Sequence, residues 1–307
     1  MYTPLEEKSF IKWMRSNNQI FTSEEYNIRL SIWMQNWRLV QEHKKKNSSF
    51  SIGMNSLSAL TPSEYSAMLS FRPISRTTHT LPKQSISNDV TIDWRDQHCV
   101  NPIKDQGMCG SCWAFSTIQS VEGQWAHFKG VLYSLSEQNL IDCCSKEYSC
   151  QGCSGGLMDG ALKCALEKQD GQFMQESDYP YSGCENTCGW DPTKAVVKIT
   201  GIANIKEGDE SDLAEKCFNY GPIAIAIDAS HFSFQLYTSG IYDESQCSPT
   251  NLDHGVGLVG FGSDNNINYW IVRNTWGTSW GESGYVRMVK DKNNQCGEAT
   301  MACFPTL

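Results

Sequence analysis

The cysteines of this chain are confined to its C-terminal two thirds, and this distribution limits what the chain can fold into. All fourteen lie between Cys99 and Cys303, and the first 98 residues contain none. Fourteen cysteines are too many for an ordinary cytosolic protein, so we expect disulfides and an oxidising or degradative compartment. Charge divides at nearly the same place, because residues 1–87 carry a net +5 and residues 88–307 a net −14. The sequence therefore predicts a basic leader (residues 1–87) that is attracted to an acidic body (residues 88–307).

The overall composition argues against several classes of protein. A formal net charge of −9 disfavours a general affinity for nucleic acid or for anionic membranes. No stretch approaches 18 consecutive apolar residues, so no transmembrane helix is expected. The run Leu5-Glu6-Glu7-Lys8 is too polar for a secretory signal peptide. Either a signal was trimmed away or the protein is not secreted, and the cysteine usage favours trimming.

Hydrophobic spacing predicts a helical leader and a body made of two different halves. Residues 25–43 should form a helix with Ser23 as N-cap and with one face that contains Ile28, Ile32, Trp33, Asn36, Trp37 and Val40. Residues 75–88 have the composition of an extended linker. In the body we expect helices over 111–123 and 157–167, and strands over 223–227, 255–261, 269–272 and 284–289. A helical lobe (roughly 98–200) followed by a strand-rich lobe (201–307) predicts an α+β fold with a site in the cleft between the lobes.

The strongest chemical signal lies in the segment Gln106-Gly107-Met108-Cys109-Gly110-Ser111-Cys112-Trp113. Its glycines predict a turn that leads directly into an apolar helix. Cys112 would then lie at a helix N-terminus, where unpaired amides and the helix dipole favour a thiolate. His254 precedes a predicted buried strand that can hold its ring near such a thiolate. Asn274, at the end of another predicted strand, could fix the tautomer of that ring.

Each of these residues has a simpler explanation when it is considered alone. Cys109 and Cys112 form a CxxC pair, which also occurs in redox dithiols and in metal sites, although the βαβ pattern of a thioredoxin-like protein is missing. His254 alone is more typical of a structural histidine, and Asn274 alone of a turn. A zinc site is a further alternative, but no histidine is near and the spacing is irregular for its four cysteines, Cys143, Cys144, Cys150 and Cys153.

Taken together, these motifs resemble the papain-like cysteine peptidases of the cathepsin L type. Cys109-Gly110-Ser111-Cys112-Trp113 matches the C-G-[SA]-C-[WY] signature of papain and the cathepsins, and the order Cys112, His254, Asn274 also agrees. Further family segments follow in order: Asp93-Trp94-Arg95, Cys153-Ser154-Gly155-Gly156, Gly221-Pro222-Ile223 and Trp280-Gly281-Glu282-Ser283-Gly284-Tyr285. The resemblance covers essentially the whole chain. It implies the papain-like two-lobe fold and a thiol-dependent endopeptidase made as a zymogen, with no cofactor and no metal.

The resemblance also implies a role for each site residue. Cys112 would be the nucleophile, His254 its ion-pair partner and proton donor, and Asn274 the residue that orients His254. Gln106 and the backbone amide of Cys112 would form the oxyanion hole, and Trp276 would shield the His254–Asn274 hydrogen bond from water. Substrate would also bind along Gly155 and Gly156.

The main specificity pocket of the family accepts P2, the second residue before the scissile bond. By resemblance its walls here are Leu157, Met158, Ala226, Leu252 and Gly255, with Met301 at the floor. Because all of these are apolar, we expect a hydrophobic P2 residue and rejection of P2 Arg. The alternative is that Glu298, three residues before Met301, reaches into the pocket.

Three disulfides follow from the resemblance, namely Cys109–Cys153, Cys143–Cys188 and Cys247–Cys296. Some of Cys144, Cys150 and Cys184 could form a further bridge, and the sequence alone does not fix the connectivity. Cys164 and Cys217 lie in apolar helical patterns and are expected to be buried free thiols.

The leader resembles the inhibitory propeptide of the same family. The spacing of the propeptide helix motif is followed by Glu25, Arg29, Trp33, Asn36 and Val40, with Lys44 where Asn is usual. A second motif keeps Gly53 and Asn55 but has Leu57 for Phe and Ala59 for an Asp that is associated with acid sensing. We therefore hypothesise that acid loosens the leader by neutralising carboxylates of the body, after which cleavage near Ser87-Asn88 frees residues 88–307. The alternative is that packing of Trp33, Trp37 and Tyr65 supplies nearly all of the affinity.

Partners and competing functions can also be stated from the sequence. The expected partners are protein and peptide substrates, the chain's own leader and cystatin-type inhibitors, for a monomer in a lysosome-like compartment or outside the cell. A non-catalytic binding scaffold is disfavoured because Gln106, Cys112, His254 and Asn274 are all present. A dithiol oxidoreductase would require an unbridged Cys109. An exopeptidase would need an insertion that blocks one end of the cleft, and none interrupts the family segments.

Overall fold

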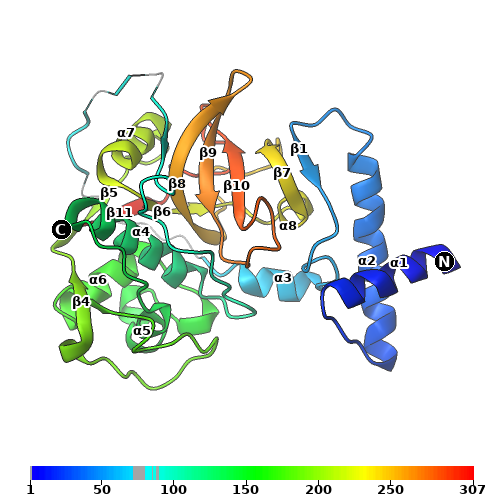
Figure 1. Ribbon diagram of the computed structural model, residues 1–307, viewed down its shortest axis with the longest axis horizontal. Helices are drawn as coiled ribbons and strands as arrows, with labels where there is room; N and C mark the ends of the chain where they lie inside the picture. The colour runs from blue at the N-terminus through cyan, green and yellow to red at the C-terminus, as the bar shows by residue number, and fades with distance from the viewer. Residues whose placement is uncertain (1, 72–79, 85, 88–89) are drawn as a thin grey trace.

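The computed structural model describes residues 2–71, 80–84, 86–87 and 90–307. The first two helices of the leader lie at one end of the molecule, and its third helix lies nearer the middle (Figure 1). Of the predicted linker 75–88, only residues 80–84, 86 and 87 are described, and they form no helix. Asn88 lies outside the described residues. None of the described helices is long and apolar enough to span a membrane.

The leader is a small helical unit with one strand. Its elements are α1 (Pro4–Ser16), α2 (Ser23–His43), β1 (Phe50–Ile52) and α3 (Pro62–Met68). The N-cap of α2 is Thr22 rather than the predicted Ser23, which is the first helical residue. The buried residues of α2 are Leu30, Trp33, Met34 and Val40. Ile28, which the sequence analysis placed on the buried face, is exposed because α2 packs against α1 through another stripe.

The leader has a hydrophobic core of its own. It consists of Phe10, Trp13, Leu30, Trp33, Met34 and Ala59, and Trp37 packs against it. Trp33 and Trp37 therefore stabilise the leader itself, which corrects the expectation that they pack on the body. Tyr65 does face the body, since its hydroxyl donates to the carbonyl oxygen of Ala229 at 2.7 Å.

The first lobe of the body is built mainly from helices. Its helices are α4 (Cys112–Lys129), α5 (Glu137–Cys143) and α6 (Met158–Lys168), with short 3-10 helices η1 (Lys146–Tyr148), η2 (Gly152–Ser154) and η3 (Pro192–Lys194). A two-stranded sheet of β3 (Gln172–Met174) and β4 (Ala195–Lys198) lies beside them. The helices predicted over 111–123 and 157–167 correspond to α4 and α6, although α4 continues to Lys129.

The second lobe is built around a sheet, to which the leader adds one strand. Its elements are β5 (Gly201–Asn204), α7 (Glu210–Tyr220), β6 (Ile223–Ile227), α8 (Phe232–Gln235), β7 (Tyr237–Tyr242), β8 (His254–Asp264), β9 (Ile267–Arg273), β10 (Tyr285–Val289) and β11 (Ala302–Thr306). The strand order is β1-β7-β10-β9-β8-β6-β11-β5, and β2 (Ile92–Asp93) pairs with β8. Strand β1 of the leader pairs antiparallel with β7, so the leader lengthens the sheet of the body. The four predicted strands correspond to β6, β8, β9 and β10.

One ion-pair cluster joins the two halves of the leader and gives a testable prediction. Arg29 of α2 donates from Nη2 to Glu64 Oε1 of α3 at 2.6 Å and to Glu25 Oε1 at 3.1 Å. The hydrogen bond from Arg29 lowers the pKa of Glu64 to about 2. A carboxyl whose pKa is lowered by folding adds stability above its unfolded pKa of about 4.3, and this stability is lost only as the pH falls through the folded value.

We therefore expect Glu64→Gln to destabilise the leader equally at about pH 7 and about pH 5, because both lie above the unfolded pKa. The expected loss in the free energy of unfolding is about 1–3 kcal/mol, as for other hydrogen bonds to charged groups. Denaturant unfolding of the full chain at both pH values measures it. A loss that is much smaller at pH 5 would mean that acid already breaks the pair.

Candidate active site

Cys112 is the first residue of α4 and lies fully buried beneath the leader. The turn before it contains Gly107, with a φ of 59°, a left-handed conformation that favours glycine. A Cβ atom at Gly255 would lie 3.2 Å from the carbonyl oxygen of Cys112, so α4 and β8 approach closely at this point. Burial raises the pKa of the Cys112 thiol, while backbone hydrogen bonds from Gly255 and Ser70 oppose the shift.

His254, the first residue of β8, is held by Asn274 and Trp276. Its Nε2 donates to Asn274 Oδ1 at 2.8 Å, and this oxygen also accepts from the amide of Thr275 at 2.8 Å. The Trp276 ring stacks on the imidazole with 4.8 Å between centroids. Burial lowers the pKa of His254 to about 4, and the hydrogen bond to Asn274 acts in the opposite direction. Because Nε2 carries the proton, Nδ1 is left as the basic nitrogen of the neutral ring, and it has no hydrogen-bond partner among the described residues.

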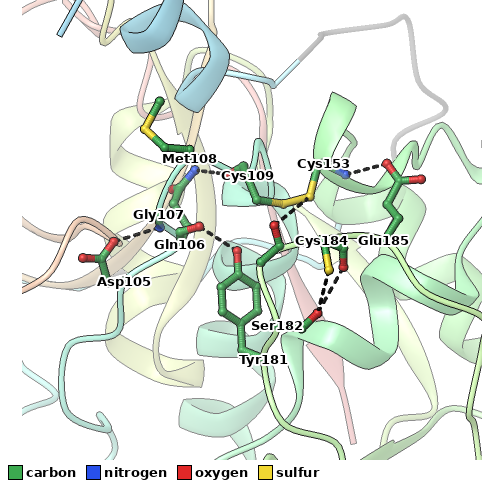
Figure 2. A pocket seen from close by; sticks show the side chains of 11 residues that line it. Asp105, Gln106, Gly107, Met108, Cys109, Cys153, Tyr181, Ser182, Cys184 and Glu185 are labelled. Carbon is green, nitrogen blue, oxygen red and sulfur yellow. Dashed lines mark hydrogen bonds between the residues drawn. A yellow bond between two sulfur atoms is a disulfide. The ribbon is translucent and has the colours of Figure 1, made fainter. Parts of the chain in front are cut away.

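Gln106 is buried, and its side-chain amide is fixed on both sides. Its Oε1 accepts from the hydroxyl of Thr275 at 2.5 Å, and its Nε2 donates to the carbonyl oxygens of Cys109 at 2.9 Å and Met68 at 3.1 Å. Figure 2 shows Gln106 at the edge of a cavity of about 560 Å³, where its own carbonyl accepts from the hydroxyl of Tyr181 at 2.7 Å. The Gln106 amide can therefore donate to an oxygen placed where the Met68 carbonyl now lies.

The leader passes through the cleft directly over these residues. After α3, the backbone of Ser70 faces the Cys112 thiol, and Phe71 forms a parallel bridge with Gly156. A Cβ atom at Gly155 would lie 2.0 Å from the carbonyl oxygen of Ser70, and one at Gly110 would lie 2.0 Å from its hydroxyl oxygen. Gly155 thus allows the leader backbone to come this close, and Gly110 leaves room for the Ser70 side chain.

The residues expected around P2 form one apolar cluster that includes a leader side chain. Leu157, Met158, Ala226, Leu252 and Met301 are buried in this cluster together with Phe71, whose amide donates to the carbonyl of Asp253 at 2.9 Å. Glu298, the alternative residue for the pocket, is 1% exposed. Burial and the nearby charge of Glu210 raise the pKa of Glu298 to about 8. Its carboxyl is therefore uncharged in acid.

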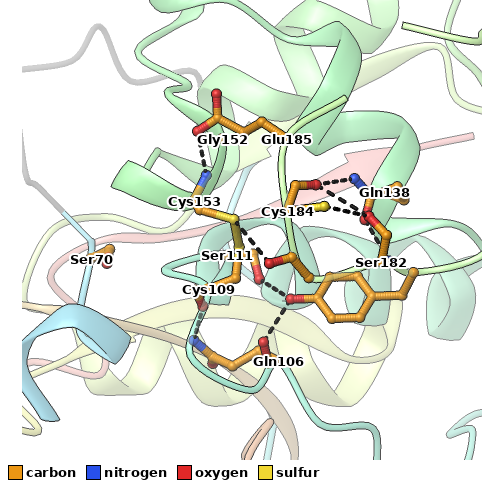
Figure 3. Close-up of a disulfide and its surroundings, with 12 residues drawn as sticks. Ser70, Gln106, Cys109, Ser111, Gln138, Gly152, Cys153, Ser182, Cys184 and Glu185 are labelled. Carbon is orange, nitrogen blue, oxygen red and sulfur yellow. Dashed lines mark hydrogen bonds between the residues drawn. A yellow bond between two sulfur atoms is a disulfide. The ribbon is translucent and has the colours of Figure 1, made fainter. Parts of the chain in front are cut away.

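The structure contains four disulfides among the described residues, and three join the pairs that the resemblance implies: Cys109–Cys153, Cys143–Cys188 and Cys247–Cys296. The fourth joins Cys144 to Cys164, so the expectation of a free thiol at Cys164 is wrong. Cys217 is a buried free thiol, as expected. Figure 3 shows the first disulfide beside Cys184, whose thiol is exposed and lies near Ser182.

These pairings bear on the alternatives for the cysteine motifs. Cys109 is bridged to Cys153, so Cys109 and Cys112 are not a dithiol. Cys143, Cys144 and Cys153 are all in disulfides, which removes the zinc site proposed for them. Within the described residues, the one group with metal-ligand spacing is Asp228, His231 and Cys247. Since Cys247 is bridged to Cys296, it offers no thiolate to a metal.

Comparison with known proteins identifies the family. Residues 89–306 match the papain family cysteine protease model, and residues 10–65 match the cathepsin propeptide inhibitor domain. The chain belongs to the papain family of cysteine proteases. It is a cysteine endopeptidase of the cathepsin L type made as a zymogen, with an inhibitor domain that covers the active site.

Individual relatives align over nearly the whole chain. The digestive cysteine proteinase 1 of Homarus americanus is 41% identical over 293 residues, which cover 92% of this chain and 89% of that protein. Procathepsin L of Mus musculus is 40% identical over 307 residues, which cover 96% and 91%. The structure of digestive procathepsin L 3 from Tenebrio molitor superposes with a TM-score of 0.90 at 36% identity, covering 99% of this chain and all of that one.

The burial of Cys112 gives a second prediction, for which Cys184 is an internal control. In the intact chain at neutral pH, iodoacetamide should modify the exposed Cys184 and leave Cys112 unmodified, because the leader covers Cys112. Removal of the leader should make Cys112 reactive at least about 100-fold faster, since alkylation requires an accessible thiolate. Peptide mapping by mass spectrometry measures both thiols in one sample. Equal rates for Cys112 before and after removal would mean that the leader does not shield it.

Proposed function

We propose that this protein hydrolyses peptide bonds in proteins through Cys112 and His254 and prefers a hydrophobic residue at P2. The observation that carries the proposal is the path of the leader: the backbone of Ser70 faces Cys112, and Phe71 is buried in the same apolar cluster as the residues expected to line the P2 pocket. This path supports binding of a peptide segment across Cys112.

In the proposed mechanism, the Cys112 thiolate attacks the carbonyl carbon of the scissile bond. The oxyanion that forms accepts hydrogen bonds from the Gln106 amide and the Cys112 backbone N–H. The His254 imidazolium protonates the leaving amine, which departs and leaves a thioester on Cys112. His254 then takes a proton from water, which attacks the thioester and releases the acid. The hydrogen bond that Nε2 donates to Asn274 fixes the ring and leaves Nδ1 as the nitrogen that would carry the proton to and from the reacting groups.

We propose residues 1–87 as the inhibitory propeptide and residues 88–307 as the peptidase domain. The match of the inhibitor family to residues 10–65 and of the peptidase family to residues 89–306 supports this division. The +5 leader and the −14 body attract each other, and this attraction weakens as carboxylates of the body are protonated. Release of the leader in acid would follow from that loss of attraction. If raising the salt concentration at neutral pH leaves inhibition by the leader unchanged, this electrostatic explanation fails.

The remaining expectations concern where and with what the protein acts. A chain with four disulfides among its described residues fits an oxidising compartment, either lysosome-like or extracellular. The digestive relatives from Homarus and Tenebrio fit a degradative role. We propose a monomer that cystatin-type inhibitors can block at the cleft.

The proposed function is tested by paired activation of the 307-residue chain and its Cys112→Ala variant. Both are held at about pH 5 with a thiol reductant, where exposed carboxylates begin to protonate. Hydrolysis of a fluorogenic peptide should appear with loss of the leader in the wild-type chain only. In the activated enzyme, Gln106→Ala should lower kcat about 10²- to 10³-fold, as loss of an oxyanion-hole donor does elsewhere. Activity in Cys112→Ala, or none in a wild-type chain that has lost its leader, would contradict the proposal.

The P2 pocket is tested by a substitution at its floor. Met301→Glu should raise kcat/KM for P2 Arg relative to P2 Leu by at least about 10-fold, because it supplies an anion to the pocket. Met301→Leu is the matched control and should keep the hydrophobic preference, since it changes shape but not polarity. The ratio is measured with two dipeptide substrates that differ only at P2. An unchanged ratio in Met301→Glu would mean that residue 301 does not face the P2 side chain.

A further inference from the structure

A further contact between leader and body, besides the cleft and the β1–β7 pairing, lies on α7. Residues 80–84, here called the strap, pass beside α7 at the opposite end of the molecule from α1 and α2 (Figure 1). Thr80 forms a parallel bridge with Asn204, the last residue of β5, and Leu81 packs against the core of the strand-rich lobe. The strap is thus bound to the body by backbone and apolar contacts.

The charged side chains of α7 make specific contacts with the strap. Lys216 is fully buried, and its Nζ donates to the carbonyl oxygen of Pro82 at 2.8 Å. The same ammonium pairs with Glu215 and lies 3.7 Å from Asp212 Oδ1. A buried lysine is costly unless its hydrogen bonds are satisfied, and Pro82 supplies one of its acceptors.

An ion pair completes the site at the N-terminus of α7. Lys83 Nζ lies 3.2 Å from Asp209 Oδ1 and 3.3 Å from Oδ2. Asp209 is the N-cap of α7, and its side chain accepts from the amide of Asp212. Among the described residues, this is the one ion pair that joins the leader to the body. These contacts define what we call the α7 site, which consists of Asn204, Asp209, Asp212, Glu215 and Lys216.

We propose that the α7 site is a further peptide-binding site of the body, separate from the substrate cleft and from the β7 edge, and that it retains the strap after the leader–body junction has been cut. This inference rests on the proposed cleavage near Ser87, because only such a cut leaves the strap on the leader. The leader is then bound to the body at three places: by β1 along β7, by residues 65–71 at the cleft and by residues 80–84 at α7. Linking weak sites raises the overall affinity, because each contact keeps the other segments at a high local concentration.

The site selects an extended segment with two features. It requires a free backbone carbonyl opposite Lys216, which Pro82 supplies, and a basic side chain opposite Asp209, which Lys83 supplies. A negatively charged residue at position 83 would face the carboxylate of Asp209 and be repelled. The site therefore responds to charge in a way that simple apolar packing would not.

The test separates the strap from the proposed activity by using the inactive Cys112→Ala full chain. A recognition sequence for a specific protease is inserted after Ser87, and the chain is cut with that protease at neutral pH. Size-exclusion chromatography and surface-capture dissociation then measure how long the cut leader stays on the body. We expect the cut leader to co-elute with the body.

Charge variants identify the strap as the cause of this retention. Lys83→Glu and Asp209→Lys should each raise the dissociation rate of the cut leader about 3- to 10-fold. This is somewhat more than the loss of one exposed ion pair would give, because each substitution also places two like charges opposite each other. The double variant should return the rate to within about 2-fold of the parent. Lys12→Glu makes the same charge change in an exposed part of α1 and should have no effect on the rate.

Two results would overturn the inference. One is a leader that leaves at once after cutting in the parent chain. The other is a dissociation rate of the Lys83→Glu leader that equals that of the Lys12→Glu leader, or that does not return toward the parent rate when Asp209→Lys is added. Neither result depends on catalysis, so an inactive wild-type enzyme would refute the proposed function and leave this inference standing.

Discussion

The close packing of α4 against β8 is the constraint on which the site depends. The hydroxyls of Ser116 and Ser120 in α4 donate to the carbonyls of Val256 at 2.7 Å and Pro222 at 2.9 Å. A Cβ atom at Gly257 would lie 2.2 Å from the side chain of Gln119, so only glycine allows this approach. Because α4 begins at Cys112 and β8 begins at His254, the same packing that joins the two lobes brings the two reactive side chains to one end of the interface.

Burial of the proposed catalytic residues in the leader-bound chain opposes the charged form of both. It raises the pKa of Cys112 and lowers that of His254 to about 4, so both shifts favour the neutral thiol and imidazole over the reactive ion pair. The hydrogen bond that His254 donates to Asn274 opposes the shift in the pKa of His254 but does not outweigh burial. Removal of the leader admits water to the cleft, which lowers the cost of the charged pair. Access and reactivity are therefore gained in the same step.

The sequence predicts best those elements whose signal is local. The Gly107 turn followed by an apolar run predicted α4, and the unbroken apolar run of β6 predicted its bounds. Strand β11 was missed because it contains Pro305, which is tolerated since that residue pairs only with β5. The sequence placed Cys217 in an apolar helical pattern but gave no bounds for helix α7. Glu215 and Lys216 have the composition of an exposed face, yet both are buried where the strap lies beside the helix. The Cys144–Cys164 bridge depends on how α5 and α6 pack, which residue spacing does not specify.

The directions of the pKa shifts narrow the ways in which acid can free the leader. Burial acts to raise the pKa of Asp209, but hydrogen bonds from the Asp212 backbone and from Lys83 outweigh it, so the net shift is downward and the ion pair persists at pH 5. Glu64 behaves in the same way. Burial raises the pKa of Asp253 to about 7, so its protonation on acidification favours the folded state rather than opposing it.

Protonation of these three carboxyls therefore does not explain release of the leader in acid, and the summed charge of the exposed carboxylates is the better explanation. Such long-range attraction is screened over about 10 Å at 0.1 M salt, so salt should weaken the binding of the leader to the body, as acid does. A mechanism that depended on one buried carboxyl would respond to acid alone.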